Sequence, residues 1–315
     1  MHRRTVLTTA LAAALTGCGR APGIGEPLPD VTAPVPSATV TAANGPVVVP
    51  GEPVRVVALD TAELDSAMTL GITPVGACRP AADHELPGYW PASRLTAVAT
   101  AGSVGAPHYE QIRALRPELI LGNQTRDGAH YDALRAIAPT VLTPTTGFPW
   151  RENFLVHARA LGSQSAADAV AGAYRGQLAT VSRALAGAGA TGRRVSLVRF
   201  VQGGRIRLYG RQNFLGTILA DLQLGRPDAQ NVDQFDVEVN PDQLGGADGD
   251  LLLYSTYGDP GAAGTDAVLA GPAWRALGAV RAHRAFPVDD QLWFEGIGYT
   301  GANLILTQLQ CLLGA

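Results

Sequence analysis

The spacing of apolar positions divides the chain into segments that predict different structures. From residue 55 to residue 142, short β-branched runs alternate with stretches of helical spacing. The expected strands are 55–59, 72–77, 95–99, 119–121 and 140–142, and the expected helices are 60–71, 109–115 and 131–137. Strands that alternate with helices in this way are typical of parallel β-α-β units. The pattern therefore predicts an N-terminal α/β lobe over residues 53–149.

The pattern changes after Trp150, where no strand signal occurs until about residue 193. Ala, Leu, Val and Tyr recur there at helical spacing, which predicts a connector of one or two long helices over 150–189. Alternation then resumes and predicts a C-terminal α/β lobe over 190–315. We therefore expect an α/β protein with two Rossmann-like lobes, joined by a long helix, and a ligand cleft between them.

The first 52 residues lack both periodicities. Arg3 and Arg4 precede an uncharged run over 5–16, which is too short to span a bilayer, and Leu-Thr-Gly leads into Cys18. This segment resembles a bacterial lipoprotein signal over 1–17, in which Cys18 is lipidated and becomes the first mature residue. A plain secretory signal is the alternative, and the export route, Sec or twin-arginine, stays open. Residues 18–52 are rich in Pro, Gly, Ala and Thr and predict a flexible tether, so we expect a lipid-anchored protein on the extracytoplasmic face of the cell membrane.

Composition narrows the function classes. Apolar residues make up 46% of the chain and charged residues 16%, which excludes a disordered protein. The net charge of −3 gives no strong electrostatic field suited to binding nucleic acid. We also expect the protein to be a monomer. The sequence contains no lysine, so Schiff-base chemistry has no residue to perform it.

Candidate catalytic and metal-binding motifs are missing from the sequence. The six histidines are scattered singly, without the spacing of metal ligands, no Gly-x-Ser-x-Gly motif is present, and no glycine-rich phosphate loop opens a predicted helix. We therefore expect neither an enzyme nor a resident cofactor or metal. Cys78 and Cys311 can form a disulfide in an oxidising compartment or remain as separately buried thiols.

Aromatic and arginine side chains gather where predicted strands end. Trp150, Tyr257, Trp293 and Tyr299 follow such strands. Arg126, Arg199 and Arg211 also stand at strand exits. Ligands of open α/β sheets sit beyond the carboxyl ends of the strands, and arginine beside aromatic faces suits a large ligand with oxygen acceptors. Core packing remains the alternative for each single aromatic residue.

Several short motifs, weak singly but specific in their order, carry a resemblance to a known family. They are RVVALD at 55–60, LRPELIL at 115–121, IAPT at 137–140, IRLYG at 206–210, WRALGAV at 274–280 and VDD at 288–290 with Trp293. The sequence resembles the substrate-binding lipoproteins of bacterial ABC importers for iron-siderophores, a group that includes vitamin B12 and haem binders. The resemblance implies two α/β lobes bridged by one long helix.

The resemblance also implies a ligand and a partner. In a ferric siderophore the chelator's own oxygens hold the iron, so the protein supplies aromatic walls and hydrogen-bond donors and no metal ligand. The ligand contacts expected on this basis are Asn123, Arg126, Trp150, Arg199, Tyr209, Arg211, Tyr257, Trp293 and Tyr299. A haem or corrinoid ligand is the alternative, and a binder of free metal is disfavoured by the scattered histidines.

Two further features follow from the resemblance. Hydroxamate binders of the family often carry an arginine before the helix that starts near Tyr109, and residues 103–107 contain none. One acidic residue on each lobe usually docks to the permease of the importer. Glu110 and Asp242 match those positions, although both also suit exposed acids at the start of a helix.

Overall fold

The computed structural model describes residues 37–81 and 85–315, so the predicted signal segment 1–17, Cys18 and residues 18–36 of the predicted tether lie outside the described residues. The first described element is a hairpin of β1 (Ser37–Ala42) and β2 (Gly45–Pro50). The prediction of a tether that extends to residue 52 is therefore wrong for residues 37–50.

Buried valines and a polar turn attach this hairpin to the N-terminal lobe. Val40 and Val49 are almost completely buried in a cluster with core residues of the lobe. In the turn, the side chain of Asn44 donates to the carbonyl of Thr140 and accepts from the amide of Leu142, both at 2.9 Å. The Val-Thr alternation is a strand signal that the Pro-rich and Gly-rich composition obscured.

The N-terminal lobe is built on a six-stranded sheet with the order β6-β5-β4-β3-β7-β8. Its strands are β3 (Val56–Ala58), β4 (Gly76–Arg79), β5 (Ala99–Ser103), β6 (Ala106–Pro107), β7 (Leu119–Asn123) and β8 (Thr140–Thr143). The pairings are parallel except for β5 with β6. Its helices are α1 (Thr61–Thr69), α2 (Ala92–Leu95), α3 (Tyr109–Ala114), α4 (Gln124–Asp127) and α5 (Tyr131–Arg135), with the 3-10 turn η1 (Gly128–His130).

The C-terminal lobe has a five-stranded mixed sheet with the order β11-β10-β9-β12-β13. Its strands are β9 (Val195–Val201), β10 (Arg205–Tyr209), β11 (Asp236–Val239), β12 (Leu251–Tyr257) and β13 (Ala285–Pro287). Strands β9, β10 and β11 pair antiparallel, whereas β9, β12 and β13 pair parallel. Around it lie α8 (Phe214–Asp221), η2 (Asp228–Gln230), η3 (Pro241–Ala247), α9 (Pro260–Ala263), α10 (Thr265–Ala270), α11 (Pro272–Ala276), α12 (Gly278–Arg281), the π-helical turn η4 (Gln291–Glu295) and α13 (Tyr299–Leu312).

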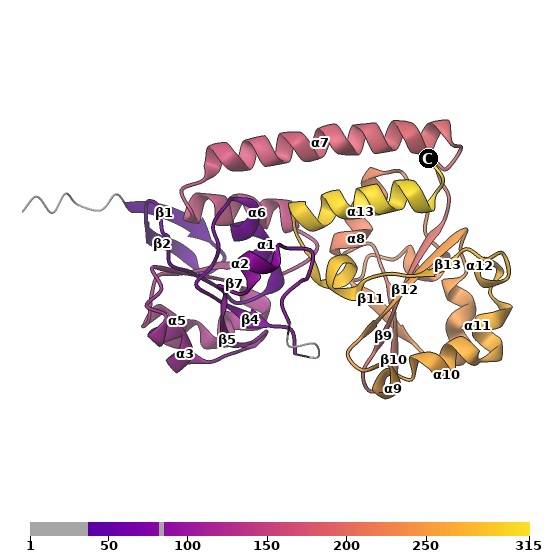
Figure 1. The fold of residues 1–315 in the computed structure, drawn as a ribbon, viewed down its shortest axis with the longest axis horizontal. Helices are drawn as coiled ribbons and strands as arrows, with labels where there is room; N and C mark the ends of the chain where they lie inside the picture. Colours follow the sequence, from indigo (N-terminus) through magenta and orange to yellow (C-terminus); the bar gives the residue numbers. More distant parts are fainter. Residues whose placement is uncertain (1–36, 82–84) are drawn as a thin grey trace, which may run out of the picture. The chain divides into compact units, whose positions relative to one another are not determined.

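The predicted connector consists of α6 (Trp150–Ala160) and the 24-residue helix α7 (Gln164–Gly187). The buried positions of α7, among them Ala167, Ala171 and Tyr174, recur every three or four residues, as one apolar helix face requires. Helix α7 lies beside α13 (Figure 1), where the Gln177 side chain donates to the carbonyl of Asn303 at 2.9 Å. None of the helices in residues 37–81 and 85–315 is long and apolar enough to cross a membrane.

Helix α1 of the N-terminal lobe is tied to the start of α13. The buried carboxylate of Asp65 accepts from the amide of Gly301 at 3.4 Å and from the hydroxyls of Tyr89 at 2.8 Å and Thr69 at 3.0 Å. The hydroxyls of Thr69 and Thr300 are 2.8 Å apart. An acidic side chain of one lobe therefore satisfies an amide at the N-terminus of a helix that packs in the other.

Both described cysteines are free thiols. Cys78 is buried in β4 and its thiol donates to the carbonyl of Ala101 at 3.4 Å, whereas Cys311 is exposed on α13. The two residues therefore form no disulfide, and a buried thiol is correct for Cys78 alone.

Candidate functional site

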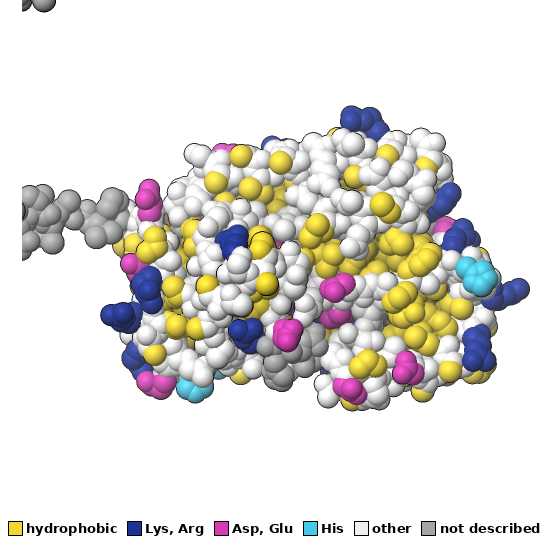
Figure 2. Space-filling view, viewed as in Figure 1, with side chains coloured by type: hydrophobic (Ala, Val, Ile, Leu, Met, Phe, Trp, Pro, Cys, Tyr) yellow, Lys and Arg dark blue, Asp and Glu magenta, His cyan; other side chains and the backbone are white. Residues whose placement is uncertain are grey.

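A cavity of about 190 Å³ is lined by side chains from both lobes. Its described lining consists of Asp60, Thr61, Pro80, Val104 and Arg126 from the N-terminal lobe, and Arg199, Val201, Arg205, Arg207, Tyr257, Phe294, Glu295 and Ile297 from the C-terminal lobe. Four of these side chains are arginines and two are carboxylates. On the face drawn in Figure 2, in contrast, the charged side chains of the described residues are scattered and form no single basic patch.

The N-terminal wall begins where two neighbouring strands end. β3 leads directly to Asp60, which caps α1 by accepting from the amide of Thr61 at 2.7 Å. β7 ends at Asn123, which caps α4 by accepting from the amide of Arg126 at 3.1 Å. Because β3 and β7 pair in parallel, these caps meet at one sheet edge. There, Nη1 of Arg126 lies 2.9 Å from Oδ2 of Asp60, and Asn123 donates to the same oxygen at 3.3 Å.

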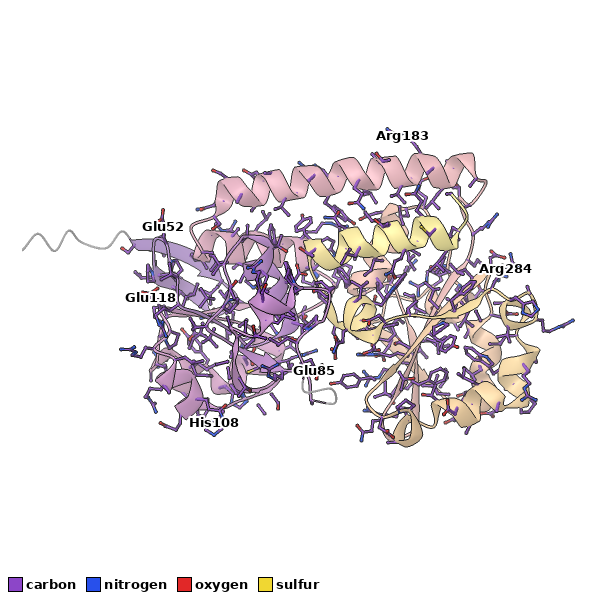
Figure 3. The ribbon with its side chains drawn as sticks, in the orientation of Figure 1. Glu52, Glu85, His108, Glu118, Arg183 and Arg284 are labelled. Carbon is purple, nitrogen blue, oxygen red and sulfur yellow. The ribbon has the colours of Figure 1, made fainter. Side chains whose placement is uncertain are left out.

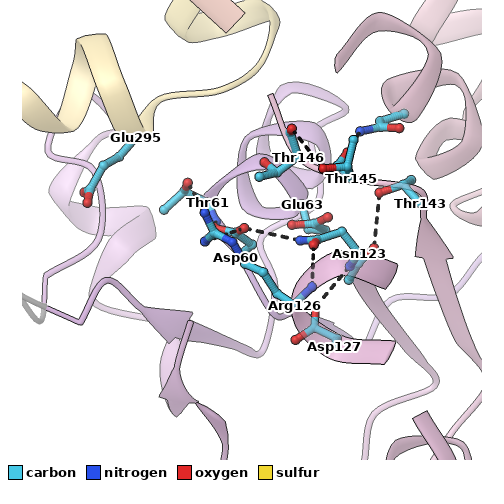
Figure 4. A network of polar contacts seen from close by, with 12 residues as sticks. Asp60, Thr61, Glu63, Asn123, Arg126, Asp127, Thr143, Thr145, Thr146 and Glu295 are labelled. Carbon is cyan, nitrogen blue, oxygen red and sulfur yellow. Dashed lines mark hydrogen bonds and ion pairs between the residues drawn. The ribbon is translucent and has the colours of Figure 1, made fainter. Parts of the chain in front are cut away.

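Two more carboxyl groups lie beneath this edge (Figure 4). Burial, and then the neighbouring Asp60 and Asp127, raise the pKa of Glu63 well above its usual range. Burial also raises the pKa of Asp127 to about 6, although the amide of Asn123 donates to its carboxylate at 3.0 Å. Burial therefore favours the protonated form of Glu63, and Asp60 is the carboxylate in direct contact with Arg126.

The C-terminal wall is one face of the β9-β10 hairpin. Arg199 and Val201 of β9 share this face with Arg205 and Arg207 of β10, because residues two apart on a strand point to the same side. The opposite face carries Phe200 and Ile206, and is packed in the core of the lobe. The register places Arg207 directly across from Arg199.

Arg199 is held by several acceptors and packed on aromatic rings. Nε donates to Oδ1 of Asp290 at 2.8 Å, Nη2 donates to Oδ2 of the same residue, and Nη1 donates to the hydroxyl of Tyr209 at 3.4 Å. Nη2 also lies 3.5 Å from Oε1 of Glu295. The guanidinium carbon is 4.3 Å from the ring centre of Tyr257 and 5.3 Å from that of Phe294. These contacts hold the Arg199 side chain in place in the cavity lining.

Arg205 and Arg207 are held more loosely than Arg199. Both use the same acceptor, Oε1 of Glu238, which lies 3.4 Å from Nη1 of Arg205 and 3.2 Å and 3.1 Å from Nε and Nη2 of Arg207. Arg207 also lies 3.5 Å from Asp236. The side chains of Arg205 and Glu238 are about half exposed, so their ion pair is screened by water.

The structure brings three of the predicted ligand contacts, Arg126, Arg199 and Tyr257, to the cavity lining. Two others position them: Asn123 caps the helix of Arg126, and Tyr209 accepts from Arg199 beneath the surface. The predicted contacts that do not line the cavity are Trp150, Trp293, Tyr299 and Arg211.

The three aromatic residues among these belong to the core. Trp150 and Tyr299 pack edge to face at 4.8 Å, and Trp150 donates through Nε1 to the hydroxyl of Thr217 at 2.9 Å. Trp293 is completely buried and donates to the Gln308 side chain at 2.7 Å. Arg211 lies outside the lining and is paired with Asp233 at 2.8 Å. Arg126 follows β7, as predicted, whereas Arg199 lies inside β9 and not at its exit. Large aromatic rings that follow strands also close the core.

Several lining residues were missed from the sequence. Arg205 and Arg207 alternate with Ile206 and Leu208, and this period of two is the signal that places both arginines on one face. At Asp60 and Thr61 the sequence predicts only the start of a helix. Phe294 and Glu295 lie in the π-helical turn η4, for which the sequence shows no distinct pattern.

The proposed docking acids are both exposed. Glu110 lies in the first turn of α3 and pairs with Arg113. His108, the N-cap residue of the same helix, is labelled in Figure 3 and shows where this helix begins. Asp242 lies in the first turn of η3, where Asn240 and Gln243 cap the helix reciprocally.

Within the described part of the chain, no three His, Cys, Asp or Glu side chains group as metal ligands.

Comparison with known proteins agrees with this architecture. Residues 56–292 match the family described as periplasmic binding protein, and the chain belongs to that family. The probable siderophore-binding lipoprotein YfiY of Bacillus subtilis is 29% identical over 83% of each chain. The crystal structure of Staphylococcus aureus SirA complexed with staphyloferrin B superposes with a TM-score of 0.78 at 25% identity, covering 88% of this chain and 98% of that one. FeuA of Bacillus subtilis complexed with ferri-bacillibactin has a TM-score of 0.74 at 17% identity, over 88% and 98% of the two chains, and shows the shared fold.

Proposed function

We propose that the protein binds a ferric siderophore in the cavity between its lobes and delivers it to the permease of an ABC importer. The observation that carries this proposal is the cavity lining, in which Arg126 of one lobe and Arg199, Arg205 and Arg207 of the other converge on the same space. Guanidinium groups donate to the oxygens of a chelator, and a chelated iron needs no ligand from the protein. YfiY is named a probable siderophore-binding lipoprotein, and the SirA structure contains staphyloferrin B, which supports this ligand class.

The protein acts in this proposal as a binding protein without turnover and without a resident cofactor. The family consists of binding proteins, and the cavity residues are suited to recognition, since Arg199 is fixed by Asp290 and Tyr209 before any ligand arrives. We further propose a monomer anchored by a lipid on Cys18 at the extracytoplasmic face, with Glu110 and Asp242 as the acids that meet the permease.

Equilibrium dialysis of the purified protein against iron-labelled chelates tests the ligand. A panel of ferric hydroxamates, catecholates and carboxylates, with haem and cobalamin, is compared at micromolar concentration. Tight retention of a ferric chelate that weakens in Arg199→Gln, but not in Arg135→Gln on the exposed face of α5, supports the proposal. Retention of haem or cobalamin alone, or of no compound, refutes it.

Separate experiments test the anchor and the docking acids. Radioactive fatty acid is expected to label the wild type and not Cys18→Ser. Charge reversal at Glu110 and Asp242 is expected to abolish uptake of the chelate by cells while affinity in solution stays unchanged. Equal labelling of both proteins, or normal uptake by the double variant, contradicts these parts of the proposal.

A further inference from the structure

A second hollow lies on the surface of the C-terminal lobe, between η3 and the junction of α10 with α11. This groove has a volume of about 350 Å³, compared with about 190 Å³ for the cavity between the lobes, and the two described linings share no residue. The described lining of the groove includes Pro241, Asp242, Leu244, Ala267, Val268 and Pro272. The groove is therefore a separate site, with room for a side chain of another molecule.

The groove exists because the residues along it are small and the chain turns there. Ala267 is exposed on α10, and a Cβ added at Gly271, the C-cap of α10, would lie 3.1 Å from the carbonyl oxygen of Val268. Pro272 at the start of α11 has no amide hydrogen with which to continue α10, so the chain turns between the two helices. Leu244 of η3 is completely buried in a core cluster of the lobe. The apolar walls are therefore supported by the packed core, while the space between them is open.

One carboxylate is the only charged group in the described lining of this groove. Asp242 is exposed in the first turn of η3 and forms no ion pair with another described residue, whereas Glu110 pairs within its own helix. Asp266, next to Ala267 on α10, adds a second exposed carboxylate, and Arg275 of α11 lies outside the lining. An apolar groove with an acidic rim is complementary to a segment that carries an apolar side chain beside a basic one.

From these observations we infer that the groove receives an apolar side chain of the importer's permease, next to a basic side chain that pairs with Asp242. The inference rests on the proposed function, in which Asp242 is a docking acid, and adds a second contact of different chemistry. An apolar side chain enclosed in a groove contributes more to affinity than an exposed ion pair. A second copy of this chain fits less well, because a symmetric pairing of two grooves places Asp242 opposite Asp242.

Filling the groove tests the inference. Ala267→Trp places a large ring between the walls and leaves Asp242 unchanged. In cells that carry this variant as the sole copy, uptake of the ferric chelate is expected to be slower by about tenfold or more, because an anchor contact with the permease is lost. The affinity of the purified variant for the chelate, measured by equilibrium dialysis, is expected to stay unchanged. Ala270→Trp is the matched control, since Ala270 is exposed on the same helix but lies outside the described lining.

A double-mutant cycle tests whether the groove and the acid belong to one contact. Asp242→Asn combined with Ala267→Trp is expected to slow uptake by less than the product of the two single effects, because both changes damage the same contact. Asp242→Asn combined with Ala270→Trp is expected to show the effect of Asp242→Asn alone. Second-site suppressors that restore uptake in Ala267→Trp are expected to replace a large apolar residue of the permease by a smaller one.

Thermal unfolding of every variant verifies that it is folded. Normal uptake in Ala267→Trp, equal slowing in Ala270→Trp, independent effects in the cycle, or suppressors that map only outside the permease overturn the inference. A wild-type dimer that dissociates in Ala267→Trp, as measured by sedimentation, assigns the groove to a second copy and also overturns it. Each of these outcomes leaves the proposed function standing as long as the wild type retains a ferric chelate in dialysis. Failure of the wild type to bind any ferric chelate removes the proposed function and the inference together.

Discussion

The guanidinium of Arg126 and the carboxylate of Asp60 lie 2.9 Å apart and join the ends of two adjacent strands of the N-terminal sheet. Asp60 is almost completely buried, whereas Arg126 is partly exposed to the cavity. Replacing Arg126 therefore removes a side chain of the cavity lining, which we propose contacts the ligand, and also leaves a buried carboxylate with fewer partners.

Arg126→Gln is expected to lower the free energy of unfolding by about 1–3 kcal/mol and to weaken chelate binding. The double variant Arg126→Gln with Asp60→Asn is expected to recover part of the stability, because no buried charge remains, but not the affinity. Urea unfolding and dialysis measure the two effects. If the double variant is less stable than the sum of the two single changes predicts, the ion pair is not the source of the stability loss.

The buried carboxyl group of Asp65 is expected to make the stability of the protein depend on pH. Burial raises its pKa from 3.8 to about 6, so the folded state holds a proton that the unfolded state releases. This contribution to stability is present below pH 4 and is lost as the pH rises to about 6 and beyond, amounting to about 3 kcal/mol at most.

Asp65→Asn lacks this titration. The difference in free energy of unfolding between wild type and Asp65→Asn is therefore expected to shift against the wild type from pH 4 to pH 7, as measured by urea unfolding. Asp132→Asn on the exposed face of α5 serves as the control for the loss of one carboxylate. A difference that stays constant across this range would show that folding does not raise the pKa of Asp65.

Gly298 leaves room for the carboxylate of Asp65. A Cβ added at Gly298 would lie 2.0 Å from Oδ1 of Asp65, which is closer than any real contact. Gly298→Ala is therefore expected to lower the free energy of unfolding by about 1–3 kcal/mol or to displace α1 from α13. Thermal and urea unfolding measure the loss.

Gly176→Ala is the matched control, because a Cβ at that exposed position of α7 would have open space around it. Helix propensity alone predicts that this change stabilises the protein by up to about 1 kcal/mol. Equal destabilisation by both substitutions would argue against a specific role for the space at Gly298.

A substitution of Trp150 distinguishes a role in core packing from a contact with the ligand. It lies edge to face against Tyr174, Phe214 and Tyr299, and donates to Thr217. Trp150→Phe is expected to lower the free energy of unfolding by about 1–3 kcal/mol, with chelate affinity unchanged. Tyr257→Leu is the counterpart in the cavity lining, and is expected to weaken binding more than folding. If Trp150→Phe loses chelate affinity while its stability is unchanged, Trp150 contacts the ligand.

The sequence was sufficient to predict the two lobes and the helical connector, because strand and helix periodicities are local properties. Arg126 and Arg199 both line the cavity, but only Arg126 follows a strand as predicted, because β9 continues past Arg199 to Val201. The role of Trp150 could not be read from its position after a strand, since only the folded chain shows that Tyr174 and Phe214 enclose it. The hairpin over residues 37–50 was not predicted. Its valines are buried by contacts of the hairpin with β8 and α6, which lie far along the chain, so the local composition did not reveal them as core residues.

Helix α1 has only nine residues, yet it connects two sites that lie apart in the fold. Its N-cap, Asp60, contacts Arg126 in the cavity lining, and Asp65, one turn further on, holds the first turn of α13. The same short helix therefore supplies a side chain to the cavity lining and another to the start of α13. A substitution that displaces α1 is expected to disturb both contacts together.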